Sequence, residues 1–452
     1  MKNYRNLKHP IALIKWSAVV CFLLMGTISK SQTHATRGIH DAIQIQTNAI
    51  FDSLVAVRHH LHRHPELSTK EKETSAYIEQ YLLDLGLEVH SGIGGHGVVG
   101  ILKGANPGKK IAWRADIDAL PIQENNNLDF ASVNEGVSHQ CGHDVHTTIA
   151  LGMAQVLTSQ KEQINGSIYF IFQPSEENFM GAKAMLKDGL MDLISPEECY
   201  AAHISPMPTG TIASKPNYLY ADYKQINVTF KSSDENEEII AYTKELISGI
   251  QNIEPDSKFW DIRNLMDPNI GIGNPNTIFK NFITTEKQFN VKEKEGKLII
   301  SEIVSASNSE LIQPLPSQLQ RLISDSPFAD QLIDISYGSE QISISNDRGN
   351  IDNHPALTRQ AIQSIANIYG PMSAIPLYGV IPDNRGDDFA YMQREVPGTY
   401  FLMGGSNFEK GIIAMPHSPN FRVDEECIRM GVQYFSSLMV ERLKDENNTP
   451  KP

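Results

Sequence analysis

The stretch Ser167-Ile168-Tyr169-Phe170-Ile171-Phe172-Gln173-Pro174-Ser175-Glu176-Glu177-Asn178 decides what kind of fold this chain forms. Its first half is a nearly continuous apolar run, as expected for a strand buried on both faces. Two adjacent carboxylates follow directly. Neighbouring side chains in a loop at a strand end point in different directions, so Glu176 and Glu177 can serve separate purposes. Two solvated loop acids would explain this pair equally well.

Helical and strand-like stretches alternate on both sides of this strand. Apolar residues recur with helical spacing in 40–64, 69–85, 141–157 and 182–187, and short apolar runs lie at 97–102, 110–115 and 199–202. This order predicts an α/β fold with helices on both faces of a sheet.

The pattern changes near Tyr223 and returns after Asn346. Between them lie a strand (225–230), a helix (234–250), a hairpin (289–303), a helix (317–323) and a strand (342–344), which is the order of a split βαβ unit. A helix (354–369), a buried strand (398–403) and a helix (424–443) then follow. We therefore expect a large domain over 40–222 and 347–443, a small α+β domain over 223–346 inserted into it, and a disordered tail over 444–452.

The first 32 residues have the features of an export signal. Basic residues precede an uncharged, mostly apolar run over 17–28, which is too short to span a bilayer, and small residues at 29–32 suit cleavage. We expect a signal peptide over 1–32 and an exported protein, periplasmic or secreted, without stable membrane insertion after cleavage. A membrane anchor is the alternative.

The charge of the chain argues against nucleic acid as a partner. There are 53 Asp and Glu against 39 Lys and Arg, for a formal net charge of −14. Nucleic-acid recognition relies on clustered Lys and Arg, and the sequence has no such cluster.

Without the signal, three cysteines remain: Cys141, Cys199 and Cys427. A small odd number does not indicate a disulfide framework. A Cys199–Cys427 bridge stays open as an alternative, and it would leave Cys141 as a free thiol. A metal ion would explain that thiol.

Cys141 lies in the stretch Ser138-His139-Gln140-Cys141-Gly142-His143-Asp144-Val145-His146. A thiolate and imidazoles suit zinc and similar ions. A buried thiol with a capping carboxylate at a helix start is an equally good explanation of these residues alone. Further candidates follow other predicted strands: Asp116 and Asp118, the Glu176-Glu177 pair, His203, and His417 between two prolines. Open α/β sheets place their active sites at such strand ends, so the joint pattern favours a metal centre.

In their order, these motifs resemble the M20 metallopeptidases, specifically the amidohydrolase branch with hippurate hydrolase, N-acyl-amino-acid amidohydrolases and auxin-conjugate hydrolases. The matching stretches are 62–67, 114–121, 141–146, 172–177, 181–185, 386–391, 396–400 and 416–419.

The resemblance implies a Zn-peptidase-like catalytic domain, with a mixed sheet and flanking helices, and an inserted ferredoxin-like lid domain through which the chain is expected to form homodimers. It implies a centre of two divalent metal ions, with zinc expected first and manganese or cobalt as alternatives. The implied ligands are Cys141, His143, Glu177, His203 and His417. Glu176 matches the general base, Asp118 a carboxylate that supports the ligands, and His146 and Asp144 are expected to be structural or to support the ligands. The expected reaction is hydrolysis of an amide bond in an N-acyl amino acid or small peptide.

The lid is where the sequence departs from the family pattern. A histidine that helps hold the substrate carbonyl is expected there, yet none occurs between His203 and His354. Losing one such donor costs about 3–4 kcal/mol in the transition state. Asn281 is the closest match to a lid asparagine, Lys292 is the nearest candidate for a lid arginine, and Asp387 replaces a common glutamate. A metal-binding protein with little or no hydrolysis, and a dipeptidase-like enzyme, are the alternatives.

Overall fold

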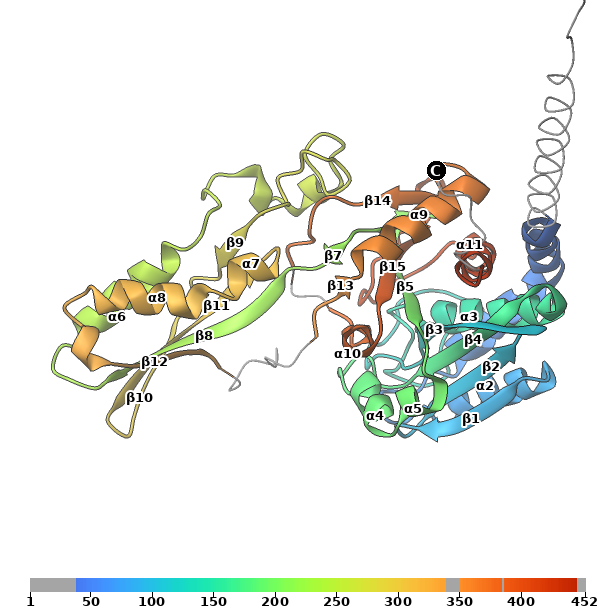
Figure 1. Cartoon of the computed structure of the whole chain (residues 1–452), viewed down its shortest axis with the longest axis horizontal. Coiled ribbons are helices and arrows are strands. Elements are labelled where there is room, and N and C mark those ends of the chain that lie inside the picture. Colours follow the sequence, from blue (N-terminus) through green and yellow to red (C-terminus); the bar gives the residue numbers. More distant parts are fainter. Residues whose placement is uncertain (1–37, 339–348, 384–385, 445–452) are drawn as a thin grey trace, which may run out of the picture.

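The computed structural model describes residues 38–338, 349–383 and 386–444 (Figure 1). The predicted signal peptide, the predicted strand at 342–344 and the tail from 445 lie outside these ranges, so export and cleavage stay predictions. Among the residues that are described, none of the helices is both long enough and apolar enough to cross a bilayer.

The larger sheet has eight strands in the order β1-β2-β4-β3-β5-β15-β6-β14. Their bounds are β1 Glu88–Ile93, β2 Gly97–Lys103, β3 Asn106–Asp116, β4 Asn165–Gln173, β5 Glu198–Pro208, β6 Ile212–Ser214, β14 Ala374–Pro376 and β15 Gly398–Ser406. The four central strands β4, β3, β5 and β15 run parallel, whereas β2 and β6 pair with them antiparallel. The sheet is therefore mixed, as expected.

Helices cover both faces of this sheet. One face packs against a helix over 38–63, α2 (Lys72–Asp84), α3 (His143–Ser159), α9 (Pro355–Tyr369) and α11 (Glu426–Arg442). The other face packs against α4 (Gly181–Lys187), α5 (Leu190–Ile194) and α10 (Phe389–Glu395). In β4, Phe170 and Phe172 point into the first core while Tyr169 and Ile171 point into the second, which confirms a strand buried on both faces.

A second, smaller sheet lies to one side of this body (Figure 1). Its strands are β8 (Asp222–Lys231), β9 (Ile283–Thr285), β10 (Asn290–Lys294), β11 (Lys297–Ala306) and β12 (Leu332–Tyr337), and its helices are α6 (Asn236–Ser248), α7 (Ser309–Ile312) and α8 (Leu315–Ser324). The strand order β10-β11-β8-β12, with all pairs antiparallel, is that of a ferredoxin-like unit. It has its own apolar core. The sequence pattern missed β12. The exact domain boundaries and dimerisation through this unit stay predictions.

Two short strands join the bodies. β7 (Asn217–Tyr218) leads toward the small sheet and β13 (Asp352–Asn353) leads back. They pair antiparallel, Asp352 opposite Tyr218 and Asn353 opposite Asn217. The chain therefore leaves and re-enters the larger body side by side.

Candidate metal centre and active site

The ends of two parallel strands bring the first group of carboxylates together. β3 and β4 end side by side, with Asp116 opposite Gln173. Beyond them, the backbone N–H groups of Glu176 and Glu177 donate to Oδ1 and Oδ2 of Asp118, both at 3.1 Å. Asp118 therefore fixes the backbone that carries the two glutamates.

A tight turn before α3 adds Cys141 and His143. Gly142 has φ +90°, and a Cβ there would lie 3.0 Å from a methyl of Ile204, so glycine suits this position for both conformation and space. His143 Nδ1 lies 3.3 Å from Asp118 Oδ1, and its Nε2 lies 3.7 Å from Glu177 Oε1.

His203 joins from β5, although it does not follow the end of that strand as the sequence suggested. β5 continues to Pro208 because it stays paired with β15. Its pairing with β3, however, stops at Ala201. His203 therefore lies two residues past the last pair with β3, and its Nε2 is 3.2 Å from Cys141 Sγ.

His417 comes from the loop before α11. Its backbone has φ +63°, and its N–H donates to the carbonyl of Gln140 at 2.7 Å, which ties this loop to the Cys141 turn. The ring Nε2 lies 3.3 Å from Glu177 Oε2. His417 has 57% of its side chain exposed and so marks the open side of the cluster.

These residues fit divalent cations. Three overlapping groups have ligand atoms within 4.8 Å of one another: Cys141, His143 and His203; Cys141, Glu177 and His417; and His143, Glu176 and Glu177. Both ring nitrogens of His143 and Oε1 of Glu177 are buried without a hydrogen-bond partner among the described residues. Buried polar atoms are normally paired, and His143 Nε2 faces Glu177 Oε1 at 3.7 Å, so these two atoms suit a shared metal ion.

The pKa shifts in the cluster also favour bound cations. Burial, together with the carboxylates of Glu177 and Glu176, raises the pKa of the Cys141 thiol well above its ordinary value. Burial, with Asp387 and Glu177 adding to it, likewise raises the pKa of Glu176. The site thus concentrates negative charge that cations would neutralise.

His146 does not supply a free ligand atom. Its Nδ1 lies 2.6 Å from Asp116 Oδ1, and its Nε2 accepts the N–H of Ile204 at 2.8 Å. Both ring nitrogens are therefore committed, and the proton lies on Nδ1. This agrees with the expected supporting role of the residue.

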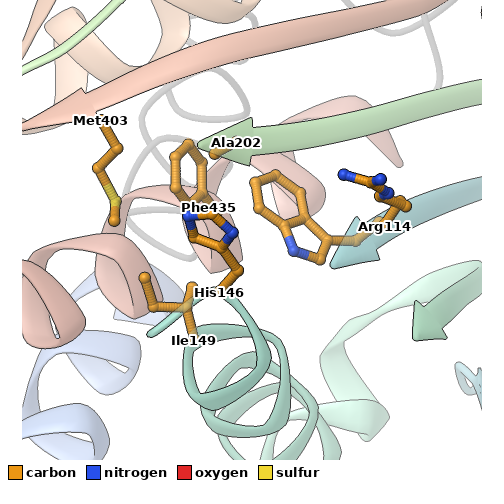
Figure 2. A pocket seen from close by; sticks show the side chains of 7 residues that line it. Arg114, His146, Ile149, Ala202, Met403 and Phe435 are labelled. Atoms are coloured by element: carbon orange, nitrogen blue, oxygen red, sulfur yellow. The ribbon is translucent and has the colours of Figure 1, made fainter. Parts of the chain in front are cut away.

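A small cavity lies beside His146 (Figure 2). Its lining residues are Trp113, Arg114, His146, Ile149, Ala202, Met403 and Phe435. Its volume of ≈ 10 Å³ is about that of a single water, so it is too small to be the substrate site.

Arg114 organises the carboxylates behind the site. Its guanidinium lies 2.7 Å from Asp116, 3.1 Å from Asp387 and 2.9 Å from Asp388. The last two directly precede α10, far along the chain. Sequence reasoning missed this pairing because no local pattern marks it; the only signal was the presence of both stretches in the family motifs.

Several other sequence candidates do not lie in the cluster. Lys292 is exposed on β10, the outermost strand of the small sheet, so it is not placed to contact a ligand at the metal centre. Asn281 is also exposed, and its carbonyl accepts a hydrogen bond from Asn252 at 3.3 Å.

The state of the cysteines contradicts the disulfide alternative. Cys141, Cys199 and Cys427 are all free and buried. The Cys199–Cys427 bridge is therefore absent.

Comparison with known proteins agrees with this geometry. Residues 112–441 match the family described as "Peptidase family M20/M25/M40". Thermostable carboxypeptidase 1 of Saccharolobus solfataricus is 30% identical over 87% of this chain and 96% of its own length. N-acetylcysteine deacetylase of Bacillus subtilis is 30% identical over 87% of this chain and 97% of its own.

A solved structure is also similar. The YXEP protein of Bacillus subtilis, described as a dinuclear metal-binding peptidase from the M20 family, has a TM-score of 0.66 and 27% identity, covering 88% of this chain and 99% of that chain. The chain thus belongs to the M20/M25/M40 peptidases, and it is a metal-dependent hydrolase of C–N bonds.

Proposed function

We propose that this protein hydrolyses the amide bond of an N-acyl amino acid or small peptide, using two divalent metal ions, zinc first and manganese or cobalt as alternatives. The observation that carries the proposal is the convergence of Cys141, His143, Glu177, His203 and His417 from separate segments, with ligand atoms left unpaired. In the proposal these five residues hold the ions.

Bound ions of this kind lower the pKa of a water and polarise an amide carbonyl. Glu176 accepts the proton of the attacking water and delivers it to the departing amine. Its Oε2 lies 3.9 Å from His143 Nε2, so it is close enough to contact a water held at the metal centre. Asp118 orients His143 and fixes the backbone of the two glutamates.

The relatives support the substrate class. The names of two of them, a carboxypeptidase and an N-acetylcysteine deacetylase, both describe cleavage of an amide that releases an amino acid. An N-acyl amino acid and a small peptide share that feature.

A second candidate is a metal-binding protein with little hydrolysis. The absence of histidine between His203 and His354 favours it, because the expected donor to the substrate carbonyl is missing from the small unit. The two candidates bind the same ions and differ in turnover.

One experiment separates them. The full chain is loaded with zinc, manganese or cobalt, its metal content is measured, and a panel of N-acyl amino acids and dipeptides is tested. We expect two ions per chain, turnover of at least one substrate, and a loss of about 10²–10⁴-fold in kcat in Glu176→Gln with both ions retained.

The matched control is Glu162→Gln, which removes an exposed carboxylate away from the cluster and should leave kcat unchanged. Two bound ions with no turnover of any panel member would establish the second candidate. Turnover that Glu176→Gln leaves unchanged would contradict the role proposed for Glu176.

A further inference from the structure

The turn that carries the two glutamates is held by two buried carboxylates. Three consecutive N–H groups, those of Ser175, Glu176 and Glu177, all point at carboxylate oxygens. Asp118 accepts the last two, and Oε1 of Glu71 accepts the N–H of Ser175 at 2.7 Å. Glu71 comes from the segment just before α2 and is 0% exposed.

The backbone at this contact is unusual. Ser175 has φ +56° and Thr69, which faces it, has φ +70°. Both are non-glycine residues in the left-handed region, which persists only where surrounding contacts impose it. The contacts are present: the N–H of Thr69 donates to Ser175 Oγ at 2.8 Å, and Ser175 Oγ donates to Glu71 Oε1 at 3.2 Å.

The helix that Glu71 precedes does not explain its burial. Glu71 is the N-cap residue of α2, but its side chain makes no capping hydrogen bond. Glu66 does that instead, accepting the N–H groups of Glu73 at 3.2 Å and Thr74 at 2.8 Å. The carboxyl of Glu71 thus accepts hydrogen bonds from Ser175 and does not cap the helix that follows it.

We propose that Glu71 is a positioning residue of the hydrolytic site: by fixing the Ser175 turn, it aims Glu176 and Glu177 at the metal centre. This rests on the proposed function, which assigns those two glutamates their roles. What the geometry requires of Glu71 is an acceptor oxygen at the right reach. Burial raises the pKa of Glu71, which agrees with a role that does not need a charge.

The reach and the charge can be varied separately. Glu71→Gln keeps the acceptor oxygen and its reach but removes the charge, whereas Glu71→Asp keeps the charge and shortens the side chain by one methylene. Glu71→Ala removes both. We expect Gln, which keeps the acceptor oxygen at Ser175, to lose less than Asp, and Asp and Ala to lose about 10–100-fold in zinc affinity at one of the two sites or in kcat, with KM less affected.

The measurements are zinc affinity by competition with a chromophoric chelator, and kcat and KM on the panel substrate that the wild type cleaves fastest. The control is Glu66→Ala, which removes the helix caps a few residues away. It should lower the melting temperature and leave zinc affinity and kcat unchanged.

Wild-type behaviour of Glu71→Asp would overturn the inference, as would a Glu71→Gln variant as impaired as Glu71→Asp. The comparison of the Gln and Asp variants tests the inference even if Glu71→Ala does not fold. Failure of the proposed function looks different: the wild type itself would cleave no substrate, while the zinc affinities of the Gln and Asp variants would still report on the turn.

Discussion

Arg114 shows how much can depend on one buried side chain. It is 1% exposed and lies among three carboxylates, those of Asp116, Asp387 and Asp388. Burial opposes a charged guanidinium, but the charges of Asp387, Asp116 and Asp388 outweigh it and raise the pKa of Arg114 well above its usual value. Without Arg114 these buried carboxylates would lose the one cation that contacts all three among the described residues.

We therefore expect Arg114→Met to lower the free energy of unfolding by about 3–5 kcal/mol, the range for removing one partner of a buried ion pair. Urea denaturation followed by circular dichroism measures the change. Arg359→Met, at an exposed position, is the control and should stay within about 0.5 kcal/mol of wild type. A change below about 1 kcal/mol in Arg114→Met would contradict the assigned role.

At the scale of residues, the sequence indicated the candidate ligands but not the side chains that surround them. Cys141, His143 and Glu177 stood in compact local motifs, and the structure brings them together as expected. The pairing of Arg114 with Asp387, and that of Glu71 with Ser175, join residues that are distant in the sequence. No spacing rule reveals such contacts, because they arise only once the strands are placed.

At the scale of elements, Glu198 ties the end of α11 to the start of β5. It is 4% exposed and accepts hydrogen bonds from Arg442 at 2.6 and 3.0 Å, and also from Lys109 and Tyr200. Burial alone would raise the pKa of Glu198, but the hydrogen bonds from Arg442, Lys109 and Tyr200 outweigh it and hold the pKa below its usual value.

A depressed pKa in the folded state has a definite consequence for stability. The contribution of Glu198 to the free energy of unfolding is fully present above its unfolded pKa of 4.5. It is lost as the pH falls through the lower pKa of the folded state. We expect Glu198→Gln to be less stable than wild type at neutral pH, and the difference to shrink below pH 4.5. Urea titrations across the pH series test this, with Glu162→Gln, at an exposed position, as the control. A difference that does not depend on pH would contradict it.

Elements were predictable from the sequence where their burial shows in their composition. β4 is apolar at nearly every position because both of its faces pack against a core, so the sequence alone predicts a buried strand there. β12 was missed because polar Asp334 and Ser336 interrupt it, and its pairing with β8 is what makes it a strand. His203 was misplaced at a strand end for a similar reason: the length of β5 is set by β15, a distant partner.

At the scale of the whole molecule, metal binding should stabilise the two bodies unequally. The candidate ligands all come from the larger body, whereas the small unit has a separate core. Each ion adds about 2.7 kcal/mol at a concentration 100-fold above its Kd. We expect chelation to lower the melting temperature and to reduce hydrogen-exchange protection around 114–119, 141–146 and 174–177, but not over 226–337.

Hydrogen exchange read by mass spectrometry resolves these segments. Adding zinc back after chelation is the control and should restore protection to the same three segments. Equal loss over the small unit would show that its folding depends on the metal centre, contrary to the separate cores.

The pairing of β7 with β13 also bears on how such a protein diversifies. Because Tyr218 and Asp352 already face each other, the ends of the inserted unit meet, and a short turn there would close the larger body. Such a unit can change in sequence or length, or be exchanged, while the larger body that holds the candidate ligands keeps its strand register. The histidine-free small unit of this chain is one outcome that such an attachment permits.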